Sequence, residues 1–108
     1  VLSHWVREKG LYSLEEGIRR ITSAPARIIG LKDRGILKVG MKADINIFDS
    51  DTVAELQPEI VHDFPGGAPR YIQGSKGYKA TIVNGKINFF DGELTGVANG
   101  EVLRHPYN

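Results

Sequence analysis

The sequence predicts an α+β fold, with N-terminal helices followed by a small antiparallel β-sheet. Apolar residues recur at helical spacing over residues 1–30, whereas residues 43–49 alternate between apolar and polar side chains, as a half-buried strand does. Further on, Asn84-Gly85 separates two β-rich runs. This dipeptide is the strongest short-range signal of a hairpin, because a type I′ turn requires positive φ at both positions.

Helices are expected over 1–9, over 14 to about 22, and over 24–29. Leu2, Trp5 and Val6 would form the buried face of the first, and Leu14, Ile18 and Ile21 that of the second. Glycines at positions 10 and 30 would end the first and third helices.

The second helix carries its own start signal. Ser13 and Glu16 have the spacing of a capping box, in which each side chain accepts a hydrogen bond from the other residue's amide. Glu15 and Arg19 stand four residues apart in the order that favours an ion pair.

Strands are expected to follow a polar turn at residues 32–35. A short strand would start at Gly35 and turn at Gly40, and a firm strand would cover 43–48 with Ile45 and Ile47 on one side. The closing hairpin would pair 81–83 with 86–90. The tail, residues 93–108, is expected on the surface, apart from Val102 and Leu103.

The intervening segment, residues 50–77, is expected to be a long loop. It contains Pro58, Pro65 and Pro69 together with Gly66-Gly67, which disfavour regular structure. A loop of this length inside a compact domain is usually functional or wraps another element.

Composition excludes several classes of protein. Lysine and arginine are scattered rather than clustered, so we expect no nucleic-acid partner. The chain has no cysteine, which excludes disulfides and thiolate ligands and agrees with a cytoplasmic protein. No apolar run is long enough to span a membrane, so no membrane partner is expected.

The residues that could carry chemistry do not form a recognisable catalytic set. The three histidines, His4, His62 and His105, have no metal-ligand spacing, and we interpret His4 as exposed and His62-Asp63 as a solvated loop pair. A triad of Ser23, His62 and Asp44 could be drawn, but any chain of this size offers such a trio. The sequence therefore predicts no catalytic, cofactor-binding or metal-binding residue.

Asp44 is the one carboxylate in an otherwise apolar strand region. A catalytic acid is conceivable there, but we favour a carboxylate that binds loop amides or pairs with Arg34. Asp33-Arg34 is interpreted in the same way, as a turn fixed by side-chain bonds.

Three segments together resemble the end of amidohydrolase-superfamily chains. They are residues 22–31 (TSAPARIIGL), 33–49 (DRGILKVGMKADINIFD) and 82–85 (IVNG), in the order and spacing of that family. Three further segments look most like the D-aminoacylase (N-acyl-D-amino-acid deacylase) branch: residues 6–10 (VREKG), 13–16 (SLEE) and 91–96 (DGELTG).

The resemblance implies a C-terminal fragment of a longer enzyme, and the chain starts at Val1 within a helical pattern. Residues 1–30 would be terminal helices of a TIM-like barrel, and 31–108 the C-terminal share of a composite β-sandwich. The parent would hydrolyse non-peptide C–N bonds, with N-acyl-D-amino acids as the substrates that this branch implies, and would use a divalent metal such as zinc.

None of the family's metal ligands or its catalytic Asp matches a position here, so the role implied for this fragment is structural. Its partners would be the upstream barrel and the N-terminal strands of its own parent chain, while the parent's substrate would be a small-molecule amide.

Two alternatives stay open. The parent could be another amidohydrolase, namely a cyclic-amide hydrolase or a deaminase. The chain could instead be a non-catalytic β-rich binding module. A lipoyl-type carrier would place its modified lysine at a hairpin tip, whereas here Lys86 follows the tip Asn84-Gly85.

Overall fold

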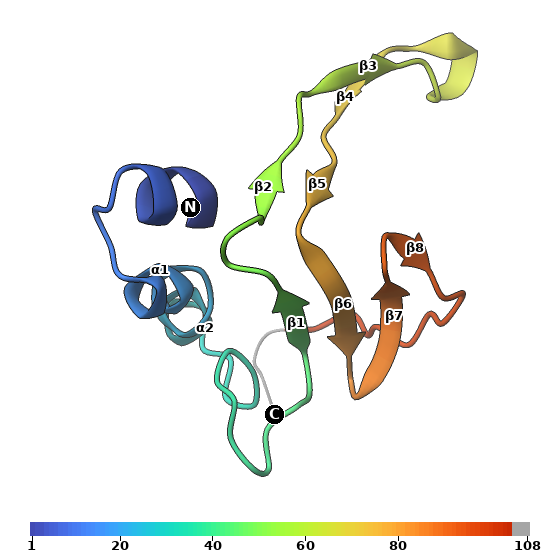
Figure 1. The fold of residues 1–108 in the computed structure, drawn as a ribbon. Coiled ribbons are helices and arrows are strands. Elements are labelled where there is room, and N and C mark those ends of the chain that lie inside the picture. The colour runs from blue at the N-terminus through green and yellow to red at the C-terminus, as the bar shows by residue number, and fades with distance from the viewer. Residues whose placement is uncertain (105–108) are drawn as a thin grey trace.

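The computed structural model describes residues 1–104, and it shows helices followed by small antiparallel sheets (Figure 1). The chain opens with a π-helical segment η1 (Leu2–Glu8), followed by the helices α1 (Leu14–Ile21) and α2 (Ser23–Ile28). Gly10 and Gly30 follow the first and third of these with φ of 61° and 78°, as expected for residues that end a helix. The α+β fold class is thus confirmed.

The main sheet contains four strands within the described residues. They are β1 (Ile45–Phe48), β6 (Tyr78–Val83), β7 (Lys86–Phe90) and β8 (Glu93–Leu94), in the antiparallel order β1-β6-β7-β8. Asn84 and Gly85 have φ of 47° and 81°, so the β6–β7 turn has the positive φ pair of type I′. The closing hairpin is therefore confirmed.

A second turn of the same kind extends this sheet. Asp91 and Gly92 have φ of 47° and 86° and reverse the chain into β8, where Leu94 pairs with Phe89. The sequence predicts a surface tail from residue 93 onward and does not predict this added strand. The expectation for Val102 and Leu103 is wrong, since 81% and 41% of their surfaces are exposed.

The long loop predicted over residues 50–77 is instead a narrow antiparallel ribbon. β2 (Ala54–Glu55) pairs with β5 (Ser75–Lys76), and β3 (Glu59–Val61) pairs with β4 (Arg70–Ile72). A 3₁₀ turn, η2 (Pro65–Gly67), joins β3 to β4. The ribbon extends away from the helices and the main sheet (Figure 1).

The prolines did not prevent this ribbon because each lies outside the paired positions. Pro58 and Pro69 each immediately precede a strand, and Pro65 starts the turn, where a missing N–H costs no ladder bond. The short strand expected at Gly35 does not form, and residues 29–44 contain only turns, bends and irregular backbone.

Helix α1 begins as the sequence predicts, but its charged side chains form different ion pairs from the predicted one. The Ser13 hydroxyl accepts a hydrogen bond from the Glu16 amide at 3.2 Å, which is one half of the capping box. The Glu16 carboxylate does not return to Ser13 but accepts from Arg19 at 2.7 and 2.8 Å and from Arg20 at 2.9 Å. The ion pair of α1 is thus formed by Glu16, not by Glu15.

The core of the described residues is thin. Only Leu2, Ala26, Val53 and Ala80 are buried apolar residues, and no large side chain is fully buried. Trp5, Leu14 and Ile21, which were expected to be buried, are 43%, 37% and 46% exposed. Their apolar stripe needs a partner that residues 1–104 do not supply.

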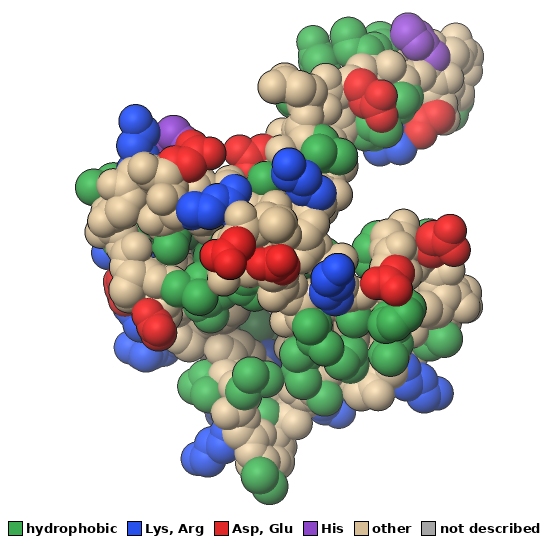
Figure 2. Space-filling view, in the orientation of Figure 1, with side chains coloured by type: hydrophobic (Ala, Val, Ile, Leu, Met, Phe, Trp, Pro, Cys, Tyr) green, Lys and Arg blue, Asp and Glu red, His purple; other side chains and the backbone are tan. Residues whose placement is uncertain are grey.

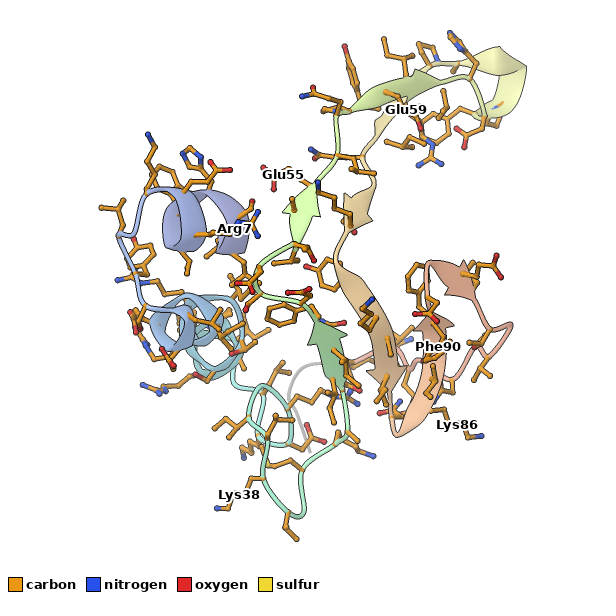
Figure 3. The ribbon with its side chains drawn as sticks, in the orientation of Figure 1. Arg7, Lys38, Glu55, Glu59, Lys86 and Phe90 are labelled. Atoms are coloured by element: carbon orange, nitrogen blue, oxygen red, sulfur yellow. The ribbon has the colours of Figure 1, made fainter. Side chains whose placement is uncertain are left out.

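The first helical segment is fastened to the base of the ribbon by polar contacts. Ser3 Oγ donates to Glu55 Oε2 at 2.7 Å, and Arg7 donates to the carbonyls of Ser50 and Val53 at 3.2 and 2.9 Å. Figure 3 labels Arg7 on η1 and Glu55 on β2. These bonds join residues that are 43 to 52 positions apart in sequence, and they hold η1 against the start of the ribbon.

Candidate functional site

The most organised polar group lies where the turn before β1 meets the β6–β7 hairpin. Arg34 Nη1 donates to Asp44 Oδ2, and Arg34 Nη2 donates to Asn84 Oδ1 at 3.2 Å. The other Asp44 oxygen, Oδ1, accepts a hydrogen bond from the backbone N–H of Asn84 at 2.9 Å. The predicted pairing of Asp44 with Arg34 and with a loop amide is confirmed.

These contacts decide what Asp44 can do chemically. Partial burial raises the pKa of Asp44, but the Asn84 amide and the Arg34 guanidinium outweigh it and leave the pKa below its usual value. A general acid at neutral pH needs a raised pKa. Asp44, with both oxygens already occupied, is therefore a structural carboxylate.

The same network continues into the tail through asparagine side chains. Asn84 Nδ2 donates to the Asn99 carbonyl at 3.0 Å, and Asn99 Nδ2 donates to the Val83 carbonyl. Asn88 Nδ2 donates to Asn99 Oδ1 at 3.0 Å and to the Val97 carbonyl at 2.6 Å. This network is not predicted from the sequence, although Asn-Gly recurs at 84–85 and 99–100 as a visible signal.

An open groove of about 400 Å³ lies between the helices and β1. Its walls are mainly apolar, and its only carboxylate is Asp44, which is already paired. The lining residues from the helical part include Leu2, Ile18 and Ile21, and those from the strands include Ile45, Phe48 and Tyr78. This groove offers apolar contact rather than acid–base chemistry.

The histidine positions do not assemble a site within residues 1–104. His4 Nδ1 lies 3.1 Å from Glu8 Oε2 on the same helical turn, and its ring meets Trp5 edge-on. His4 is only half-exposed, which is less than the sequence suggested. His105 lies outside the described residues.

His62 lies directly after β3, whereas Ser23 starts α2 and Asp44 immediately precedes β1. The ribbon that carries β3 extends away from α2 and β1 (Figure 1). The trio of Ser23, His62 and Asp44, which the sequence offers only by residue availability, is therefore not assembled. Asp63, the residue after His62, accepts two hydrogen bonds from Arg70, both at 2.6 Å. His62 and Asp63 therefore do not form a pair that faces a bound ligand.

The described residues also do not fit a divalent metal. No group of three or more His, Cys, Asp or Glu residues among them lies close enough to hold one. Two of the carboxylates, Asp44 and Asp63, are each occupied by an arginine. No helix in this part of the chain has the length and apolar content needed to cross a membrane.

One face of the main sheet is apolar and half-exposed. Cross-strand pairing aligns Ile47 with Ala80 and Phe90 in one row, and Ile45 with Ile82 and Ile87 in the next. We call these six residues the apolar sheet face. Ile47, Ile87 and Phe90 are 49%, 45% and 53% exposed.

The space-filling view shows hydrophobic side chains (green) gathered over the region of β1, β6 and β7 (Figure 2). Figure 3 labels Phe90 and Lys86 on β7, at its two ends. A one-layer sheet with an apolar face of this kind normally packs on a second layer.

The motifs that build this arrangement match a known family. Residues 2–89 match the family described as "Amidohydrolase family". The chain belongs to the amidohydrolase family. The match includes η1, both helices, the ribbon and the sheet almost to the end of β7.

Among similar members of the amidohydrolase family are three enzymes of Alcaligenes xylosoxydans xylosoxydans. An N-acyl-D-glutamate deacylase is 49% identical over 51% of this chain and 11% of its own length. An N-acyl-D-aspartate deacylase and a D-aminoacylase are 39% and 32% identical, each over 95% of this chain and 19% of their own length. These relatives support the D-aminoacylase branch that the sequence motifs indicated.

A dihydroorotase from Lactobacillus helveticus is 32% identical over 82% of this chain and 21% of its own length. The chain thus spans about a fifth or less of the curated relatives it matches. No solved structure matches the chain significantly.

Proposed function

We propose that this chain is the C-terminal part of a metal-dependent amidohydrolase that hydrolyses N-acyl-D-amino acids. The observation that carries the proposal is the 39% identity to an N-acyl-D-aspartate deacylase over 95% of this chain. The chain supplies only 19% of that relative's length, so the reaction would be performed by residues outside it.

The role proposed for residues 1–108 is structural. Residues 1–30 would be terminal helices of a barrel, and 31–108 would form one share of a composite β-sandwich, with the rest of the longer protein as its partner. The half-exposed apolar sheet face and the exposed stripe of η1 and α1 support this division, since both lack a partner within residues 1–104.

A divalent metal, zinc by the family's usual chemistry, would be held by residues outside the described part, because these residues do not fit one. A cytoplasmic location is proposed from the absence of cysteine in the sequence. Nucleic acid is not proposed as a partner, because the basic residues are scattered.

Cyclic-amide hydrolysis is the second candidate function, since the dihydroorotase relatives cover 82% of the chain at 32% identity. A deaminase and a stand-alone binding module have no such support, and family membership weighs against the binding module.

The test is an assay of the complete protein with N-acetyl-D-glutamate, N-acetyl-D-aspartate, N-acetyl-D-leucine, their L-enantiomers and dihydroorotate. The protein is first stripped with a chelator and then supplied with zinc. We expect zinc-dependent release of a D-amino acid and no turnover of the L-enantiomers. Turnover of dihydroorotate alone would establish the second candidate, and activity of residues 1–108 by themselves would contradict the structural role.

A further inference from the structure

Two Asn-Gly dipeptides lie against each other at the closed end of the β6–β7 hairpin. Asn84-Gly85 forms the turn itself, and Asn99-Gly100 lies in the tail that crosses it. Asn84 Nδ2 donates to the Asn99 carbonyl at 3.0 Å, while Asn99 Nδ2 donates to the carbonyl of Val83, next to the turn. The other asparagines are followed by Ile47 and Phe89 or end the chain.

Asn-Gly is the dipeptide in which an asparagine side chain most readily loses ammonia. The following backbone nitrogen attacks Cγ, the bond from Cγ to the side-chain nitrogen breaks, and the expelled nitrogen leaves with a proton as ammonia. Water then opens the resulting succinimide at either carbonyl, which gives aspartate or isoaspartate. The only co-reactant is water, and glycine is favourable because no side chain obstructs the ring closure.

We propose that Asn84 and Asn99 are mutually protected deamidation sites, in which reaction at one asparagine releases the other. At Asn84, both of the groups that would react are held by hydrogen bonds. The nucleophile, the Gly85 amide, donates to the Ala43 carbonyl at 3.0 Å. The electrophile is fixed by Arg34, which donates to Asn84 Oδ1 at 3.2 Å. Attack requires both bonds to open, so it requires local opening of the hairpin end.

Protection at Asn99 acts through its carboxamide. Asn99 Oδ1 accepts from Asn88 Nδ2 at 3.0 Å, and Asn99 Nδ2 donates to the Val83 carbonyl. Both ends of the group are thus held against β6 and β7, while Gly100 is exposed. The carboxamide must rotate away from these partners before the Gly100 nitrogen can reach Cγ.

The coupling follows from the bond that the two sites share. Deamidation of Asn84 to aspartate removes the Nδ2 donor and leaves carboxylate oxygens facing the Asn99 carbonyl, which is also an acceptor. Isoaspartate would in addition lengthen the backbone inside a type I′ turn whose φ values are set by Asn84 and Gly85. Either product loosens the tail, and loosening the tail frees the Asn99 carboxamide. In the other direction, deamidation of Asn99 removes the Nδ2 donor to the Val83 carbonyl, which loosens the tail and with it the Asn99 carbonyl that holds Asn84 Nδ2.

The experiment follows deamidation of the complete protein by peptide mapping and mass spectrometry, at neutral pH, in buffer and in concentrated urea. We expect both asparagines to react at least about tenfold more slowly in buffer than in urea, because reaction requires opening. Equal rates in the two conditions would overturn the protection.

Coupling is tested with Asn84→Asp and Asn99→Asp, each compared in buffer with the unchanged protein. Each variant should raise the rate at the other asparagine by at least about threefold. Asn46→Asp is the matched control, because it introduces the same charge on β1 and keeps an oxygen that can accept the hydrogen bond from Thr81. It should leave both rates unchanged.

Asn99→Asp leaves both residues of the hairpin turn unchanged and therefore keeps the proposal testable if Asn84→Asp fails to fold. Circular dichroism establishes which variants are folded. A folded Asn99→Asp protein with an unchanged rate at Asn84 would overturn the coupling.

Discussion

Gly77 lies so close to Val53 that no side chain fits between them. A Cβ on Gly77 would come within 2.5 Å of the Val53 nitrogen and Cα, and its φ is +87°. The Gly77 carbonyl also accepts a hydrogen bond from the Asp49 amide at 2.8 Å. This contact joins the end of β1 to the start of β6, where the ribbon leaves the sheet.

Gly77→Ala should therefore be strongly destabilising. The substitution adds a backbone clash of about 1–3 kcal/mol to the roughly 1–2 kcal/mol cost of a left-handed φ. Gly40→Ala is a matched control, because Gly40 has φ of +89° but nothing within 4 Å of its Cβ position. Thermal melts of both variants decide the matter, and an equal loss of stability would mean that the Val53 contact is not present.

Gly85→Val should cost more stability than Lys86→Val. Gly85 has φ of 81°, and a β-branched residue forced to that value costs about 1–3 kcal/mol. Lys86 is the first residue of β7 and is exposed, so valine there keeps a favourable strand conformation. The measurement is denaturant unfolding of both variants, and equal midpoints would argue against a type I′ turn.

Arg34→Met should destabilise the protein more than Arg70→Met. The Arg34 side chain is only 10% exposed and binds Asp44 and Asn84, so its loss should cost about 1.5–3 kcal/mol. The Arg70–Asp63 pair is 43% and 50% exposed, where an ion pair contributes below about 1 kcal/mol. Free energies of unfolding from urea titrations check this order, and the reverse order would refute it.

The stabilising effect of Asp44 should disappear in acid. Its folded pKa lies below the ordinary value of 3.8, because the Asn84 amide and Arg34 outweigh the effect of partial burial. A carboxylate whose pKa is lowered by folding stabilises fully above its unfolded pKa, and that contribution is lost as the pH falls through the folded pKa. The stability gap between the unchanged protein and Asp44→Asn should therefore narrow below about pH 4.

Melting temperatures of both proteins at neutral pH and at about pH 3 measure this gap. Glu16→Gln is a useful comparison. Arg19, helped by Arg20, lowers the pKa of Glu16 to about 2 against the partial cost of desolvation, so its contribution should persist to lower pH. A gap at Asp44 that does not change with pH would contradict the pairing with Arg34.

Local sequence was sufficient wherever a residue's own conformational preference decided the structure. Asn84-Gly85 specified its hairpin because few other pairs tolerate two positive φ values, and Ser13 specified the start of α1 because its hydroxyl can accept from a free amide. The family motifs likewise lie in contiguous segments, so the amidohydrolase assignment could be made from the sequence and was confirmed by the match to residues 2–89.

Only the tertiary structure decided the features that depend on residues distant in sequence. The ribbon from β2 to β5 could not be predicted from its prolines. A proline shows where a strand cannot donate a ladder hydrogen bond, but not which positions pair across the 3₁₀ turn. The asparagine network required the tail to return over the hairpin, bringing Asn99 to Asn84 and Asn88. The spacing of Leu14 and Ile21 predicted that they share one face of α1 and are buried. Their burial depends on a partner surface, however, and the pattern of one helix does not show whether the chain supplies that surface.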